Sequence, residues 1–152
     1  MEKDQHSLFF PSEVSRKELE DEIKNYAIKN DDLKQLLPAG FAIHHAGLCR
    51  SDRTAVEELF GRGLIQVLVS TMTLAWGVNL PAHGVIIKGT ELYDAARGGW
   101  VDVDILDVIQ IFGRAGRPQF EKCGEGIIIT KSAELQYYLS LMNVEAEEAR
   151  DA

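Results

Sequence analysis

Three short runs of apolar residues constrain the fold of this chain more than any other feature. They are Ile65–Ser70, Val85–Lys88 and Gly126–Thr130, and each is rich in Val and Ile along its whole length. Strands without a polar face are buried on both sides, which is typical of a parallel sheet between two layers of helices. Helical patterns separate the runs, so the sequence predicts an α/β domain of three layers.

The segments around these runs carry their own signals. Ser15 and Glu18 form a capping-box pattern ahead of an apolar repeat that continues through Leu19 and Ile23. The remaining predicted elements are a short turn at Leu33–Leu37, a strand at Phe41–His44, and helices at Arg53–Phe60, Asp104–Phe112 and Ser132–Met142. We therefore expect a mostly helical segment at 1–40, the main domain at 41–143, and a frayed tail at 144–152.

The composition excludes several classes of protein. A length of 152 residues suits one domain, and a net charge of −8 argues against a freestanding basic nucleic-acid binder. Adjacent His44 and His45 would point to opposite faces of a strand, and Cys49 and Cys123 have no metal-ligand spacing, so we expect no metal site and free thiols. No run reaches membrane length and no signal peptide is visible, so we expect a soluble intracellular protein.

The string from Gln110 to Pro118 (QIFGRAGRP) is the sharpest candidate for chemistry. A predicted helix runs into a glycine-interrupted turn that carries two arginines, Arg114 and Arg117. Guanidinium groups bind phosphate oxygens through two parallel hydrogen bonds, as a phosphate sensor or arginine finger requires. Gln110 lies one helical turn before Arg114 and can face the same ligand. An arginine pair at a helix end is commonly a solvated cap, but the complete string favours function.

Two further segments lie at predicted strand ends. Thr71 and Thr73 follow the strand Ile65–Ser70, at the edge where open parallel sheets bind ligands. The alternative is an ordinary strand-to-helix connection. Ala42–Leu48 (AIHHAGL) combines a strand, a glycine turn and a helix start, with Arg50 just beyond, which suggests a contact with backbone phosphate. Between Glu91 and Asp104 the α/β alternation stops, and a turn-like centre predicts a β-hairpin, with a plain surface loop as the alternative.

In this order and spacing, FAIHHAGL (41–48), VLVSTMTLAWGVNLPAHGVIIKGT (67–90) and DVIQIFGRAGRPQF (107–120) resemble motifs IV, V and VI of superfamily-two helicases. They look most like the branch of large tandem-cassette RNA helicases. Residues 134–143 favour its spliceosomal type, whereas Gln119 and Phe120 are more similar to its activating-signal-cointegrator type. The resemblance covers residues 33–143 and implies the second RecA-like domain of a helicase, a fold of the P-loop NTPase type.

The resemblance also implies roles for particular residues. The ATP-contacting set would be Gln110, Gly113, Arg114 and Arg117 at the phosphates, with the two arginines catalytic, and Gly77 and Asn79 near the ribose. The set that grips the nucleic-acid backbone would be His45, Ala46, Gly47, Arg50, Thr71 and Thr73. The strand-separating hairpin would use Leu92, Tyr93, Arg97, Trp100 and Val103.

The expected partners follow from the same resemblance. They are RNA, in the form of a small nuclear RNA duplex, other spliceosomal proteins in the nucleus, and a first RecA-like domain that holds the Mg²⁺ of ATP. The chain contains no GxxxxGK(S/T) phosphate loop and no Asp-Glu box. The first strand of such a domain, expected before Met1, is also missing, so we expect a sheet incomplete at its N-terminal edge and no ATP turnover by the chain alone.

Two alternatives remain open at this point. The first is a short, non-catalytic module that binds nucleic acid or a protein partner, which the Glu-rich residues after Asn143 favour. The second is part of a DNA-unwinding repair helicase of the cointegrator type, which differs in substrate.

Overall fold

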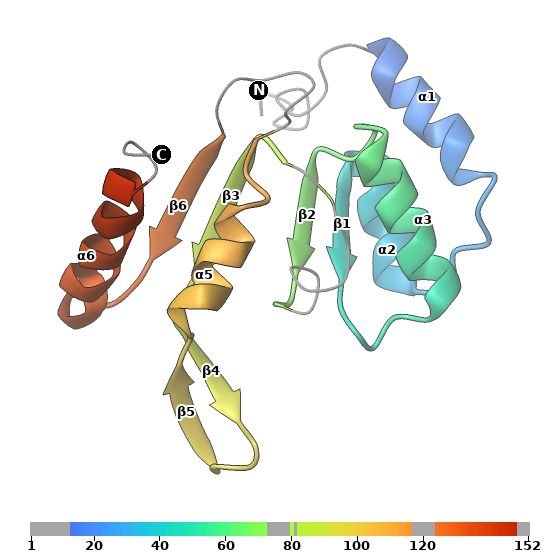
Figure 1. Cartoon of the computed structure of the whole chain (residues 1–152). Helices are drawn as coiled ribbons and strands as arrows, with labels where there is room; N and C mark the ends of the chain where they lie inside the picture. Colours follow the sequence, from blue (N-terminus) through green and yellow to red (C-terminus); the bar gives the residue numbers. More distant parts are fainter. Residues whose placement is uncertain (1–12, 73–79, 81, 117–123, 149–152) are drawn as a thin grey trace, which may run out of the picture. The chain divides into compact units, whose positions relative to one another are not determined.

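The computed structural model describes residues 13–72, 80, 82–116 and 124–148 (Figure 1). The chain divides into two compact units, Met1–Leu80 and Pro81–Ala152, and each is described by itself. None of the helices in the described ranges is both long and apolar enough to cross a bilayer.

The first unit is built on two parallel strands, β1 (Phe41–His44) and β2 (Val67–Ser70). Parallel strands need a crossover connection, and α3 (Arg50–Gly61) provides it. Helix α2 (Asp31–Leu36) and α3 both pack against β1. The core of this unit consists of Leu19, Leu33, Leu37, Ala42, Val56, Leu59 and Ile65, all nearly inaccessible to solvent.

Polar contacts fix the outer helices of this unit. The Asn30 side chain caps α2 by accepting the N–H of Leu33 at 2.9 Å. Helix α1 (Glu13–Ile23) is tied to the end of α3 by the bidentate pair of Arg62 with Glu22, both bonds 2.9 Å long. These contacts explain why the charged first part of the chain packs onto the unit.

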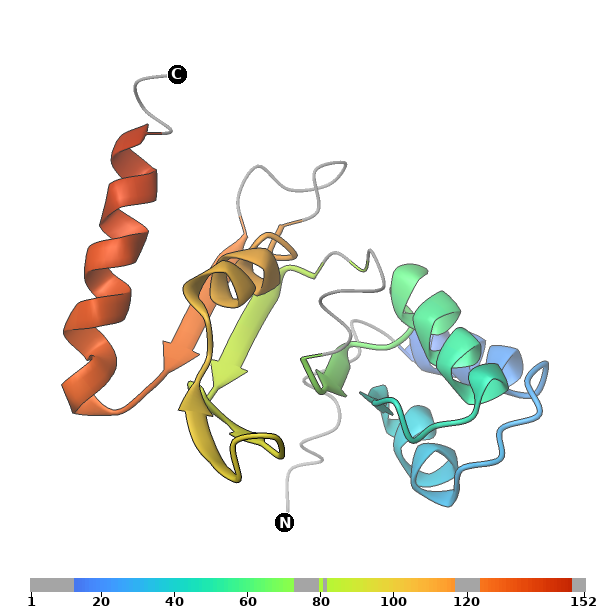
Figure 2. The same ribbon diagram turned by 60° about the horizontal axis from the view of Figure 1, so that its bottom comes forward.

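The second unit is built on another parallel pair, β3 (Gly84–Lys88) and β6 (Glu125–Ile129). Helix α5 (Ile105–Phe112) lies over this ladder, and α6 (Ser132–Glu148) follows β6. The antiparallel strands β4 (Glu91–Asp94) and β5 (Gly99–Asp102) form a hairpin between β3 and α5. Figures 1 and 2 both show this hairpin leaving the ladder at the end where β3 and β6 finish.

One face of the β3–β6 ladder is covered and the other is open within this unit. Ile87 and Val108 are buried together with the covering helix, whereas Ile86 and Ile127 are 64% and 50% exposed. Among the described residues of the unit, no helix covers the second face. Strands with two apolar faces are typical of a sheet that is covered by a layer on each side, so the open face of this ladder is an apolar surface without a covering layer in this unit.

The structure confirms the predicted α/β class, its strands and the β-hairpin, and it moves several boundaries. Helix α3 begins at Arg50 rather than Arg53, and α6 continues to Glu148 rather than ending at Met142. The predicted turn at Leu33–Leu37 is the helix α2 followed by a 3₁₀ segment, η2 (Leu37–Ala39), that contains Pro38. Side-chain capping by Asn30 explains this difference, since a capped turn propagates further.

Candidate nucleotide and nucleic-acid site

The loop after α5 carries the first predicted site. Asp104 caps the N-terminus of the helix by accepting the N–H of Leu106 at 2.8 Å, and Gly113 ends it. Gln110 is exposed near the C-terminus of α5. Arg114 is half-buried, and its backbone N–H donates to the carbonyl of Ile111 at 3.0 Å. Gln110, Gly113 and Arg114 therefore lie within one turn at the end of a helix, as predicted.

Backbone contacts hold this arginine loop in place. The N–H of Ala82 donates to the Arg114 carbonyl at 2.9 Å, and the N–H of Gly116 donates to the Ala82 carbonyl at 2.7 Å. These bonds form a parallel bridge between Ala82 and Ala115. Gly116 has a φ of +96°, which favours glycine, so the turn that aims the loop depends on this residue.

Gly124 is a residue of this site that the sequence reasoning missed. A Cβ atom there would lie 2.2 Å from the backbone nitrogen of Gly116 and 2.3 Å from the carbonyl carbon of Ala115. Only a glycine permits this approach of two backbone segments. Gly124 follows Arg117 by seven residues, and a glycine at such a place is an ordinary turn signal that nothing in the sequence connects with the arginines.

Four predicted residues lie outside the described part of the chain: Arg117, Gly77, Asn79 and Thr73. Their assignments remain predictions.

The first unit brings together most of the residues predicted to grip nucleic acid. The N–H of Thr71 donates to the carbonyl of His44 at 3.2 Å, which extends the β1–β2 ladder beyond the C-terminal ends of both strands. Thr71 therefore lies beside the turn that begins at His45. In that turn Ala46 and Gly47 are exposed, and Arg50 is exposed at the start of α3.

The two histidines make separate contacts. His45 Nδ1 accepts the N–H of Gly47 at 3.1 Å and so shapes the turn. His44 is buried, and its Nε2 lies 2.7 Å from a carboxylate oxygen of Glu57 on α3. The sequence did not predict the His44–Glu57 pair, because 13 residues separate its members. It joins β1 to the crossover helix.

The hairpin presents an aromatic pair to solvent. Tyr93 and Trp100 are cross-strand partners, with ring centroids 5.8 Å apart and planes at 75°. The two residues are 58% and 70% exposed. Leu92 is half-buried, and Arg97, exposed in the turn, lies 3.4 Å from Asp94. Large exposed aromatic side chains on a projecting ribbon are typical of a surface that contacts another molecule.

The root of the hairpin is anchored to β6 and α6. The N–H of Val103, a buried residue, donates to the Thr90 carbonyl at 2.7 Å, and the hydroxyl of Tyr138 on α6 donates to the Val103 carbonyl at 3.3 Å. Lys131 pairs with Glu91 at the first residue of β4. Through these bonds the hairpin keeps a fixed direction from the ladder.

A second set of bonds closes the same root. The hydroxyls of Thr90 and Thr130 lie 2.6 Å apart and contact a Glu134 carboxylate oxygen at 2.5 and 3.0 Å. The hydrogen bond from Thr90 lowers the pKa of Glu134, so the carboxylate stays ionised at neutral pH. Carboxylate oxygens of Glu91, Asp102 and Glu134 lie within 4.8 Å of one another, and nothing else at this cluster points to a bound ion.

Comparison with known proteins gives consistent matches. The family of helicase conserved C-terminal domains matches residues 5–119. The chain is 67% identical over 116 residues to the DExH-box ATP-dependent RNA helicase DExH12 of Arabidopsis thaliana, which is 76% of this chain and 5% of that protein. It is 57% identical over 148 residues to the human U5 small nuclear ribonucleoprotein 200 kDa helicase, which is 94% of this chain and 7% of that protein. The chain thus spans a small part of these relatives.

Proposed function

Since this chain belongs to the family of helicase conserved C-terminal domains, we propose that it acts as the second RecA-like motor domain of an ATP-dependent RNA helicase. In this proposal residues 41–143 form the motor domain, preceded by the helical segment 1–40 and followed by 144–152. The observation that carries it is the arginine loop, whose backbone is pinned through Ala82 so that Arg114 is fixed at the end of α5.

The arginine loop supplies charge to ATP bound between two domains. Arg114 and Arg117 contact the phosphates, together with Gln110 and Gly113, while Gly77 and Asn79 lie near the ribose. Arginines placed in this way stabilise the charge that develops during phosphoryl transfer, and they contribute about 10³–10⁵ in rate. The first RecA-like domain would supply the phosphate loop and hold the Mg²⁺, because the 152 residues contain neither the GxxxxGK(S/T) sequence nor the Asp-Glu box.

The turn after β1 and the end of β2 hold the RNA backbone. Thr71 and the turn His45–Gly47, in which Ala46 and Gly47 are exposed, lie together at the C-terminal ends of two parallel strands. Arg50 adds a positive charge and Thr73 a hydroxyl. Backbone contacts of this kind position a strand without reading its bases, as a motor that moves along RNA requires.

The hairpin separates the strands. Its exposed aromatic pair and its anchored root suit a rigid element against which a duplex is pulled apart. In each cycle, closure on ATP moves the RNA contacts of this domain relative to those of the first RecA-like domain. The paired strand is then displaced at the hairpin, by Leu92, Tyr93, Arg97, Trp100 and Val103.

The biological setting comes from the relatives. The human and Drosophila melanogaster relatives are named as helicases of the U5 small nuclear ribonucleoprotein, at 57% and 66% identity. We infer a role in pre-mRNA splicing in the nucleus, with a small nuclear RNA duplex as substrate and other spliceosomal proteins as partners.

A chimera tests this function. The 148 residues matched in the human helicase are replaced by this chain, and ATP hydrolysis, RNA binding and duplex unwinding are measured. We expect all three activities, and we expect Arg117→Ala to abolish hydrolysis while leaving RNA affinity unchanged. Arg16→Ala, an exposed arginine on α1, is the matched control. A chimera that binds RNA but never hydrolyses ATP would instead support the non-catalytic binding module, and equal loss of binding and hydrolysis in Arg117→Ala would exclude a phosphate-sensing role.

A further inference from the structure

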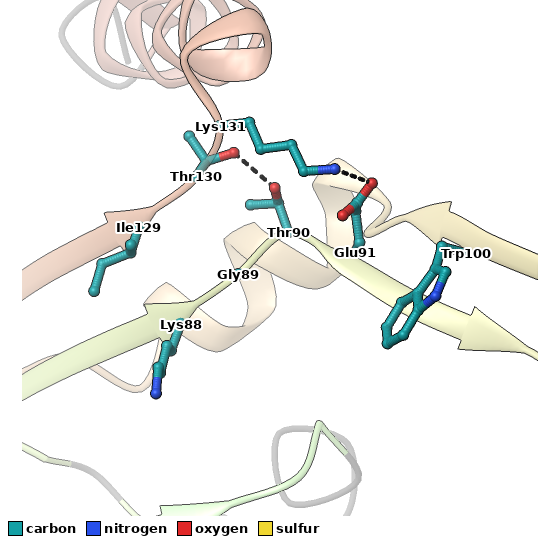
Figure 3. Close-up of a pocket in the computed structure, with 8 residues that line it drawn as sticks. All are labelled: Lys88, Gly89, Thr90, Glu91, Trp100, Ile129, Thr130 and Lys131. Atoms are coloured by element: carbon teal, nitrogen blue, oxygen red, sulfur yellow. Dashed lines mark hydrogen bonds and ion pairs between the residues drawn. The ribbon is translucent and has the colours of Figure 1, made fainter.

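A hollow of about 370 Å³ lies at the root of the hairpin (Figure 3). Its walls come from the C-terminal ends of β3 and β6 and from both strands of the hairpin. Ligands of open parallel sheets bind at this edge. The lining residues are Lys88, Gly89, Thr90, Glu91, Trp100, Ile129, Thr130 and Lys131.

Most polar groups of the hollow are already paired with one another. The hydroxyls of Thr90 and Thr130 bond to each other and to Glu134, and Thr90 is only 3% exposed. The Lys131 ammonium is bound to Glu91, and this bond raises the pKa of the lysine. These pairs fix the walls, and the groups that form them are not available to a ligand.

Two groups remain uncommitted. The Lys88 ammonium forms no ion pair with any side chain in the described ranges, and Trp100 is 70% exposed apart from its edge contact with Tyr93. In Figure 3 both point to the side of the chain opposite the Lys131–Glu91 bridge. Gly89 between β3 and β4 has a φ of +90°, and a Cβ there would meet no atom within 4 Å, so the floor stays open.

We propose that this hollow binds one nucleotide of a single-stranded nucleic acid, with its base against the indole of Trp100 and its phosphate at the ammonium of Lys88. A base stacks on an aromatic ring whatever its identity, and a lysine holds a phosphate as a point charge. Glu91 lines the hollow, and carboxylate oxygens of Asp102 and Glu134 lie within 4.8 Å of its own. This negative charge disfavours a phosphate beside Glu91, so we place the phosphate at Lys88. The site deepens the proposed function, since it places a nucleotide beside the separating hairpin.

The test measures binding of a short fluorescein-labelled oligouridylate to the 152-residue chain by anisotropy at several salt concentrations. Lys88→Gln is expected to reduce the slope of log K against log salt by about 0.7, the value for one phosphate contact to a single strand. Lys88→Arg keeps the slope. Trp100→Leu is expected to weaken binding at least about fivefold, as loss of one stacked base does, and Trp100→Phe restores most of it. Matched controls are Lys17→Gln and Tyr137→Leu, which change an exposed lysine and an exposed tyrosine elsewhere.

The outcomes separate this site from the motor function. Both substituted side chains are exposed, so circular dichroism should show the wild-type fold. An unchanged salt slope in Lys88→Gln, or full affinity in Trp100→Leu, would overturn the nucleotide site. The second result is also the one expected if Trp100 contacts a protein instead of a base. The chimera's ATP hydrolysis and unwinding judge the proposed function by themselves, whatever these binding curves give.

Discussion

Asp52 on α3 provides a direct test of how the first unit is held together. Its side chain is 1% exposed, and its two carboxylate oxygens accept the N–H groups of Lys29 and Asn30 at 3.0 and 2.8 Å. Those two residues lead into α2, so one buried carboxylate ties α2 to the helix that begins with Arg50. Burial by itself would raise the pKa of Asp52, but the two amides, a hydrogen bond with the Cys49 side chain and the charge of Lys29 together outweigh it and hold the pKa below its ordinary value of 3.8.

The size of the effect follows from these two bonds. A hydrogen bond to a charged group contributes about 1.5–3 kcal/mol, and removing the acceptor leaves a buried donor unsatisfied. Taking the lower value for each bond, Asp52→Ala is expected to reduce the free energy of unfolding by about 3 kcal/mol. Asp52→Asn keeps one acceptor oxygen and is expected to lose about half as much.

Urea unfolding of the 152-residue chain, followed by far-ultraviolet circular dichroism, measures this loss. With a slope of about 1–3 kcal/mol per molar urea, Asp52→Ala should lower the midpoint by about 1–3 M without changing the slope. Asp21→Ala changes an exposed aspartate that pairs with Lys24 on the surface, and it should leave the midpoint unchanged. A midpoint for Asp52→Ala equal to that of the Asp21 control would show that the carboxylate does not tie these elements together.

The same residue predicts a pH dependence with a definite sign. Because the folded pKa of Asp52 lies below the unfolded one, its stabilisation is complete above pH about 4 and is lost as the pH falls through the folded pKa. The difference in unfolding free energy between the wild type and Asp52→Asn should therefore be constant near neutral pH and shrink below pH 4. A difference that grew with acidification would refute the reasoning.

Two further predictions concern the second unit. Gly124→Ala forces a Cβ into the backbone of Gly116, which displaces the arginine loop. In the chimera, ATP hydrolysis should therefore fall at least tenfold while RNA binding persists. The control is Gly99→Ala, because a Cβ at Gly99 meets no atom within 4 Å. Replacing the hairpin from Asp94 to Gly99 by a minimal turn should abolish unwinding and leave RNA-stimulated ATP hydrolysis intact, and unwinding at the wild-type rate would remove the hairpin from the mechanism.

The elements that local patterns determine were predictable from the sequence. The strand Phe41–His44 has the predicted bounds, and the hairpin has its turn where the Asp94–Gly99 centre predicted it, because glycine and aspartate carry turn signals that depend on nearby residues alone. The end of α6 was not predictable in this way. Its Glu- and Ala-rich last turns favour helix, but the composition of residues 144–152 is equally typical of a frayed tail.

The contacts that sequence reasoning missed join a motif residue to a residue beyond its own helical turn or strand. Gly124 lies against Gly116, Glu57 against His44 and Glu134 against Thr90. In each pair one residue belongs to a motif, but its partner, Gly124, Glu57 or Glu134, lies outside every motif. The proximity of Arg114 and Gln110 was predictable from the sequence because the two residues are one helical turn apart. The backbone contact that holds their loop comes from Ala82, which is distant in sequence, and the bridge between Ala82 and Ala115 shows it only in the structure.

Helix α5 connects the hairpin and the arginine loop of the second unit. The hairpin ends at Asp102, Asp104 caps the helix two residues later, and the arginine loop begins at the other end, past Phe112. Eight helical residues span about 12 Å. Phe112 at the end of the helix lies against Gly126 on β6, and Val103 before the helix accepts a hydrogen bond from Tyr138 of α6, so each end of α5 is fixed to a neighbouring element of this unit. In the proposed mechanism, a force that ATP exerts on Arg114 therefore reaches the hairpin through one rigid helix, and the hairpin moves with the nucleotide-binding edge of its own domain.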